Sequence, residues 1–212
     1  MFLVYAIALA FVGYVIYLFF DFNKGLSTTS SVLLKDMQSL NDRLVDIELS
    51  PWDEIDILSR IGDAQSSKKI FGDVETAVLY SIYHEPIMAY AAKRYLHDGA
   101  LSFAVKFDDE IYSISPHNPT TLIARQGDQE VARIDTKELN GTRNGLVVKI
   151  NHEDGTDLLP VKFNGEIKLL INAHDAADVD QTRAIVNKET ISSEERKLFL
   201  LVLSYALIDQ LI

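Results

Sequence analysis

The sequence predicts a mainly β protein in which an antiparallel, barrel-like sheet encloses a hydrophobic C-terminal helix. An N-terminal transmembrane helix and a short helical stalk are expected to precede the sheet. Three observations predict this architecture. Short alternating apolar and polar stretches follow one another from about residue 69 to residue 188. The last segment is apolar on every side, and the first is long and free of charge.

The first segment, residues 2–20, has no charged side chain. As a helix it would span about 28 Å, which matches the hydrocarbon core of a bilayer. A cleaved signal peptide is the alternative, but the run is longer than usual, no Lys or Arg precedes it and no small-x-small site follows. The pattern therefore favours a retained single-pass anchor. Lys24 and Lys35 follow it, which favours a cytoplasmic position for the rest of the chain.

The expected division of the chain is an anchor at 1–24, a stalk at 25–50 and a sheet domain at 51–212. Within the stalk, apolar residues recur at steps of four and three, which predicts an amphipathic helix. About two heptads are present, so the helix could lie on the domain or the membrane, or it could form a homodimer. The residues of this apolar seam are Leu33, Met37, Leu40, Leu44 and Ile47.

Residues 52–61 are expected to form one further short helix, and strands follow. Successive strand patterns are joined by turn-forming residues, of which Asn164-Gly165 is the strongest hairpin signal, since a type I′ turn needs positive φ at both positions. Sequential hairpins without helices between them predict an antiparallel sheet that curls on itself. The expected strands lie within 78–83, 87–95, 101–107, 110–114, 120–125, 130–134, 145–150, 156–163, 166–171 and 182–188.

The last segment is predicted to be a helix that begins at a capping box, because Ser192 is followed three residues later by Glu195. From residue 198 to residue 208 no side chain is charged. Eleven residues are too few to span a bilayer, which takes about 20. A helix that is apolar all round is therefore expected to be surrounded by the sheet.

A curled antiparallel sheet followed by an apolar terminal helix resembles the tubby-like domain shared by tubby proteins, phospholipid scramblases and LURP-one-related proteins. The similar pieces are VLYSIYHEPIMAYAAKRY (78–95) and TRAIVNKETISSEERKLFLLVLSYALID (182–209). The resemblance implies a sheet around a hydrophobic C-terminal helix, and association with lipid. The chain departs from tubby proteins in lacking a recognisable cluster of Lys and Arg. It departs from scramblases in lacking Cys-rich and Pro-rich N-terminal parts, so the resemblance implies fold more than activity.

Composition excludes several classes of function. The chain has no cysteine and a formal net charge of −11. Thiolate chemistry is therefore excluded, and an acidic surface disfavours a nucleic-acid partner. No nucleophile elbow, phosphate-binding loop or dinucleotide-binding turn is present, so no cofactor is expected.

Few residues suggest chemistry. His84 and Glu85 in one predicted turn, with His117, form the alternative of an enzyme whose site lies at strand ends. Asp178, Asp180 and Glu189 fit positions 1, 3 and 12 of a calcium loop. Arg183 stands where that loop needs Gly, so a solvated loop is favoured.

Two basic pairs are the candidates for contact with lipid head groups, provided that they come together in space. They are Lys68-Lys69 and Lys93-Arg94. The expected function is therefore a non-catalytic, membrane-anchored domain that binds a lipid or a membrane protein. The alternatives are an assembly subunit that dimerises through the stalk and the enzyme near His84 and Glu85.

Overall fold

We describe a computed structural model of the chain. The residues that it describes are 30–50, 60–67, 74–81, 84–95, 99–151, 158–172, 183–187 and 191–209. The predicted anchor lies outside these residues, as do residues 52–59 of the region expected to be helical. In the part of the chain that is described, no helix combines the length and apolar composition that a bilayer-spanning helix needs.

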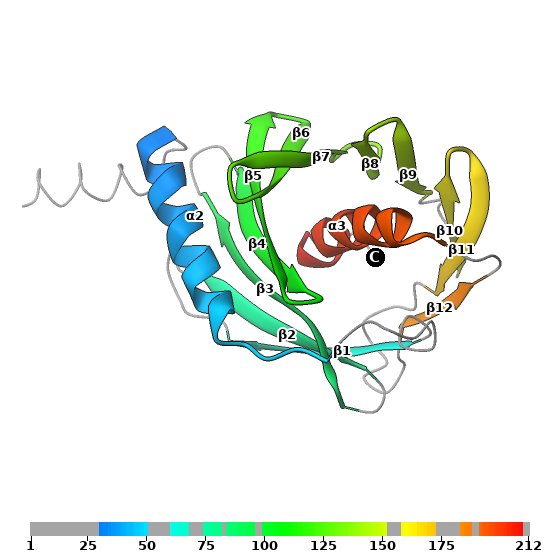
Figure 1. Ribbon diagram of the computed structural model, residues 1–212, viewed down its shortest axis with the longest axis horizontal. Coiled ribbons are helices and arrows are strands. Elements are labelled where there is room, and N and C mark those ends of the chain that lie inside the picture. The colour runs from blue at the N-terminus through cyan, green and yellow to red at the C-terminus, as the bar shows by residue number, and fades with distance from the viewer. Residues whose placement is uncertain are drawn as a thin grey trace, which may run out of the picture.

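Ten consecutive strands, β2 to β11, form a continuous antiparallel sheet in which each strand pairs with the next along the chain. Figure 1 shows the sheet curling around the last helix. The mainly β, antiparallel class predicted from sequence is confirmed. The strands are β2 (Glu75–Ser81), β3 (Pro86–Arg94), β4 (Leu101–Phe107), β5 (Glu110–Asn118), β6 (Thr121–Gln126), β7 (Gln129–Asp135), β8 (Asn140–Arg143), β9 (Leu146–Ile150), β10 (Leu158–Phe163) and β11 (Glu166–Asn172).

Two further strands lie at the margins of this sheet. β1 (Arg60–Ser67) pairs with β2, and β12 (Arg183–Asn187) pairs with β11. β1 and β12 meet over two residue pairs only, Arg60↔Ala184 and Ile61↔Arg183. The helix predicted for 52–61 is therefore wrong at residues 60 and 61, which are extended. The sequence prediction missed β1 altogether, and it also missed β8, which is only four residues long.

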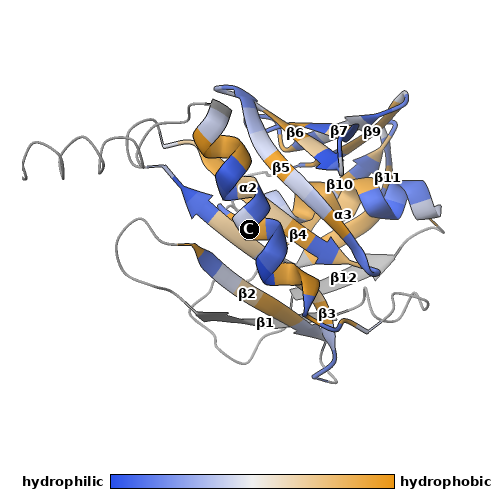
Figure 2. Cartoon of the chain, turned by 60° about the vertical axis from the view of Figure 1, so that its left-hand side comes forward, coloured by the Kyte–Doolittle hydropathy of each residue, from blue (hydrophilic) through white to orange (hydrophobic). Residues whose placement is uncertain are grey.

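The helix α3 (Ser193–Ile208) lies inside the curve of the sheet (Figure 1). Its residues from Leu198 to Ala206 are all buried, and all but Ser204 belong to one apolar cluster with side chains from β2 to β7 and from β9 to β11. Ser204, the one polar residue in this stretch, donates its hydroxyl to the carbonyl of Leu201 at 2.8 Å. In Figure 2 the helix is hydrophobic along this length. The expectation that the sheet, and not lipid, surrounds this helix is thus met.

The helix approaches the short strand β8 most closely at Gly141. A Cβ atom on Gly141 would lie 2.6 Å from Cγ2 of Val202 and 2.9 Å from Cδ1 of Leu198. Only a residue without a side chain fits such a contact.

We name the two ends of the sheet after the helix. The end where α3 begins is the start end, and the end where α3 stops is the finish end. The β4–β5 turn at Asp108-Asp109 lies at the start end, and Arg94, where β3 finishes, lies at the finish end.

The helix α2 (Ser30–Val45) packs on the outer face of the sheet, against β3, β4 and β5 (Figure 1). Leu40 and Leu44 are fully buried there against three small side chains, Ala89, Ala91 and Ala104. Small residues let the helix backbone come close to the strands. Met37 and Ile47 pack at the edges of the same cluster. Of the two alternatives for the apolar seam, the structure shows the helix lying on the domain.

Polar contacts hold α2 at each end. Near its beginning, Asp36 accepts hydrogen bonds from Lys93 at 2.7 Å and from the hydroxyl of Tyr95 at 2.9 Å. At its other end, the buried ammonium group of Lys106 donates to the carbonyls of Val45 at 3.2 Å and Ile47 at 2.7 Å. The carbonyl of Val45, the last helix residue, has no partner within the helix, so the lysine acts as a C-terminal cap that also binds the chain just beyond it at Ile47. The predicted boundary at residue 51 places α2 outside the sheet domain, whereas the contacts make it part of that domain.

Replacing Leu201 with Asp should unfold the domain, because an unpaired carboxylate would lie in the apolar interior. The expected loss in the free energy of unfolding is about 4 kcal/mol or more. Thermal or denaturant unfolding of the detergent-solubilised chain measures it. Leu34→Asp is the control, since Leu34 is 74% exposed and should tolerate the charge. A Leu201→Asp chain with native stability would show that α3 is not in the core.

Replacing Lys106 with Met should loosen α2 while leaving the sheet folded. The last helix carbonyl, of Val45, and the carbonyl of Ile47 just beyond it lose a charged donor, which costs about 1.5–3 kcal/mol. Amide hydrogen exchange in residues 36–47 should become faster than in β4 and β5. The matched control is Lys149→Met, which removes an exposed pair with Glu138 and should change stability by less than about 0.5 kcal/mol. Equal protection of α2 in both variants would contradict the capping role.

Candidate functional site

Among the described residues, four ion pairs gather at the start end of the sheet, around the first turn of α3. Four consecutive helix residues, Glu194 to Lys197, each pair with a different part of the sheet. We call these four pairs the charged collar. They are Glu194–Arg143 at 3.1 Å, Glu195–Lys168 at 2.9 Å, Arg196–Asp108 at 3.7 Å and Lys197–Glu110 at 2.8 Å.

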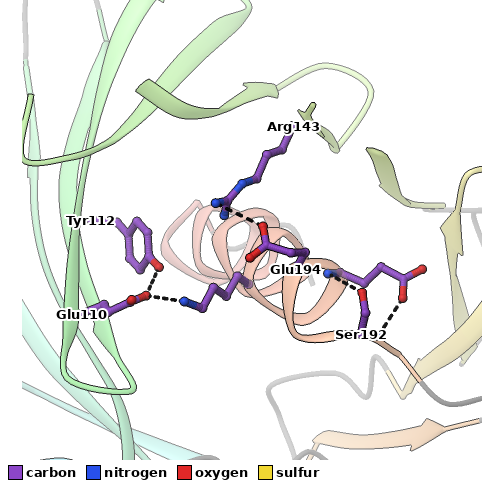
Figure 3. A network of polar contacts seen from close by, with 7 residues as sticks. Glu110, Tyr112, Arg143, Ser192 and Glu194 are labelled. Carbon is purple, nitrogen blue, oxygen red and sulfur yellow. Dashed lines mark hydrogen bonds and ion pairs between the residues drawn. The ribbon is translucent and has the colours of Figure 1, made fainter. Parts of the chain in front are cut away.

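The local sequence explains why these charges sit where they do. Ser192 caps the helix: its hydroxyl accepts from the backbone of Glu195 at 3.2 Å, and the Glu195 carboxylate accepts from the backbone of Ser192 at 2.7 Å. The predicted capping box is therefore confirmed. Glu194 and Glu195 also suit the positive end of the helix dipole. Figure 3 shows Glu194 pointing toward Arg143 and Ser192 lying below the first turn.

One carboxylate of the charged collar, that of Glu110 in the β4–β5 hairpin, accepts from two donors. Glu110 accepts hydrogen bonds from Lys197 and from the hydroxyl of Tyr112 (Figure 3). Partial burial raises the pKa of Glu110, but the hydrogen bonds from Lys197 and Tyr112 outweigh it and hold the pKa below its usual value. Burial, followed by the bond to Glu110, raises the pKa of Tyr112 well above its usual value. The pair is thus ionised Glu110 and protonated Tyr112 at neutral pH.

The same balance applies to Glu195. Its burial raises the pKa, but the hydrogen bonds from Ser192 and Lys168 outweigh that effect and lower it. At the finish end, burial and a hydrogen bond to Asp209 raise the pKa of Tyr205 to about 12. Asp209 also binds Arg94 at 2.5 Å, so α3 has charged contacts with the sheet at both of its ends.

The geometry of the collar favours a structural role over chemistry. A general base or nucleophile needs a group that is free to meet a substrate, with a second group placed to activate it. Each carboxylate of the collar instead has a cation of its own, and Tyr112 is held protonated. Among the described residues, no three side chains of the types that ligate metals are placed to share an ion.

The residues predicted for an enzyme site do not come together. His84 and Glu85 lie in the exposed β2–β3 turn at the start end, where His84 has a φ of 60°. His117 is exposed near the end of β5, at the finish end. The turn itself is held by backbone bonds, from Ser81 to Glu85 at 2.8 Å and from His84 to Ser81 at 3.0 Å.

The other predicted sites are placed only in part. Asp178, Asp180 and Glu189, the calcium candidates, lie outside the described residues, as do Lys68 and Lys69. Lys93 is 15% exposed at its side chain and paired with Asp36, while Arg94 is 51% exposed and paired with Asp209. Lys93 therefore positions α2, and its part in binding head groups stays a prediction.

Sequence reasoning missed Asp36, Lys106 and the partners of the collar. Their contacts join residues far apart in the chain: Lys197 and Glu110 are 87 positions apart, and Lys93 and Asp36 are 57 apart. The one signal that could have found Lys106 is its position in β4, where a charged residue stands in an otherwise apolar strand.

Comparison of the chain with protein-family models, with curated proteins and with solved structures found no match. The resemblance to the tubby-like domain therefore remains a prediction from the sequence.

The collar predicts a loss of stability in acid. A carboxylate whose pKa is lower in the folded than in the unfolded chain stabilises the fold above the unfolded value, about 4.3. That contribution is lost as the pH falls through the folded pKa. The melting temperature should therefore drop below about pH 4.5, and Glu195→Gln should lower it at pH 6 and flatten its dependence on pH.

Glu166→Gln is the matched control, since it changes an exposed carboxylate in the neighbouring β10–β11 hairpin. It should leave both the melting temperature at pH 6 and the acid transition close to those of the wild type. If Glu195→Gln also changes neither, the collar does not stabilise the fold.

Proposed function

We propose that the chain is a membrane-tethered, non-catalytic domain that binds a lipid or a membrane protein at the bilayer surface. The observation that carries the proposal is the position of α3. A curled sheet of this kind can enclose a small ligand, as lipocalins do, but here the interior is occupied by the helix from Leu198 to Ala206. A partner would therefore be met on the outer surface.

The charge-free run of residues 2–20 supports the tether. A tether keeps the domain within a few nanometres of the bilayer, where the effective concentration of lipid and of membrane proteins is high. A weak site, with a Kd of roughly 0.1–1 mM, would then be occupied. A strongly basic surface is not needed under these conditions, which reconciles a net charge of −11 with work at a membrane.

The two alternatives receive less support. The enzyme would need His84, Glu85 and His117 to converge, and they lie at opposite ends of the sheet. A dimer through the stalk would need the apolar seam to be free, and Leu40 and Leu44 are buried against the sheet. The location that we favour is the membrane, crossed once by the chain, with the domain on the cytoplasmic side.

The proposal predicts that the full chain stays in the membrane after a carbonate wash and cross-links there to photoactivatable lipid or to a neighbouring membrane protein. A chain that lacks residues 1–24 should be soluble and bind vesicles poorly. A full chain recovered in the soluble fraction would contradict the tether.

The same material tests the enzyme alternative. We expect no hydrolase or transferase turnover, and His84→Ala and Glu85→Gln should leave cross-linking unchanged. A measurable turnover that either substitution abolishes, with the circular dichroism spectrum intact, would favour the enzyme over the binding domain.

A further inference from the structure

The beginning of α2 and the end of β3 form one corner of the domain. Asp36 joins them, because its carboxylate accepts from both Lys93 and Tyr95. The ammonium of Lys93 also lies 5.3 Å from the centre of the Tyr95 ring. Arg94 stands between these two residues and reaches the last turn of α3 through Asp209. The corner is therefore a rigid junction of α2, β3 and α3.

This corner presents an apolar side chain and two cations to the outside. Leu34 is 74% exposed, the largest value among the exposed large apolar side chains of the described residues. Lys35 beside it is exposed, and the side chain of Arg94 is 51% exposed. A guanidinium has five donors, so the contact with Asp209 leaves Arg94 able to bind a phosphate as well. An apolar residue next to a cation suits the interface of a bilayer, and Arg94 lies at the same end of the domain, on the face of β3 that meets α3.

The chain itself brings this corner close to the predicted anchor. Only nine residues, 21–29, separate the charge-free run from α2, and nine residues span at most about 31 Å. α2 cannot swing away from the sheet without breaking the contacts of Asp36, Leu40, Leu44 and Lys106. The predicted anchor would therefore keep this corner of the domain close to the bilayer.

From these observations we infer that the corner formed by Leu34, Lys35 and Arg94 is the surface that contacts the lipid bilayer. Leu34 enters the head-group layer, and Lys35 and Arg94 bind the phosphates of neighbouring phospholipids. Lys93, which is mostly buried, holds the corner together through Asp36. The inference rests on the proposed function, because it needs the tether.

Other exposed apolar side chains compete for this role, and one of them, Val45 at 57%, lies at the opposite end of α2 from Leu34. Val147, Leu158 and Ile167 are 39%, 47% and 40% exposed, and they lie on β9, β10 and β11. These strands lie on the opposite side of the domain from α2 (Figure 1), so the tether does not hold them near the bilayer.

The chain contains no cysteine, so one introduced thiol can carry an environment-sensitive dye at a single place. We would label Leu34→Cys, Ile167→Cys and Asp128→Cys in the full chain. The last of these lies in the β6–β7 turn at the start end. The labelled chains would be reconstituted in vesicles of phosphatidylcholine and phosphatidylserine that contain lipids spin-labelled at the head group.

Quenching by the spin-labelled lipid should be at least about twofold stronger at Leu34 than at the other two positions. Lys35→Glu should weaken the quenching at Leu34, since each cation near an anionic surface contributes about 1 kcal/mol, or about fivefold in occupancy. Lys162→Glu, the same charge change on the outer face of β10, is the matched control and should leave it unchanged.

Flotation with the vesicles separates this inference from the proposed function. A full chain that does not float overturns both. A chain that floats, but whose label is quenched equally or more strongly at Ile167 or Asp128, overturns the inference and leaves the tether in place. Equal effects of Lys35→Glu and Lys162→Glu would show that this corner has no specific contact with lipid phosphate.

Discussion

The burial of α3 inside the sheet is the constraint on which the rest of the structure depends. A helix that is apolar from Leu198 to Ala206, with one internally bonded Ser, cannot face water on any side. A curled sheet, in turn, needs something to fill its inner face. The sheet covers the apolar helix, and the helix fills the inner face of the sheet. The two ends of the helix lie at the two ends of the sheet, where polar side chains are needed. The charged collar at Glu194 to Lys197 and the Tyr205–Asp209–Arg94 contact meet that requirement.

The outer face of the sheet follows a different rule, because it is covered on one side only. Alanines at positions 89, 91 and 104 let α2 pack close to the strands. Lys106, beneath the C-terminal end of α2, donates to two carbonyls that would otherwise lack donors. A charge this deeply buried is tolerated only because it has such partners. The result is a helix that belongs to the domain and carries the chain rigidly toward residues 21–29. A tether attached there would orient the domain as well as hold it.

Filling the interior has a consequence for function. The groups that most resemble a reactive site, Glu110, Tyr112 and Lys197, are bonded to one another and hold the start of α3 in place. The shifted pKa values of Glu110 and Tyr112 record structural pairing, which is one of the two common origins of such shifts. The function that we propose therefore relies on the outside of the domain, where the corner of Leu34, Lys35 and Arg94 combines exposure, charge and closeness to the predicted anchor.

The sequence by itself determined the elements whose signals are local. The period of α2, the capping box at Ser192 and the Asn164-Gly165 turn, with φ values of 49° and 93°, depend on neighbouring residues and were predicted. The short strand β8 and the marginal strand β1 were not predicted, since four residues around a glycine, or a polar strand at the margin of the sheet, have little periodicity to detect. The partners of Asp36, Lys106 and Glu110 were decided only by the tertiary structure. Polar contacts between residues 57 to 87 positions apart leave no pattern along the chain, because the curl of the sheet, and not the sequence spacing, sets which groups meet.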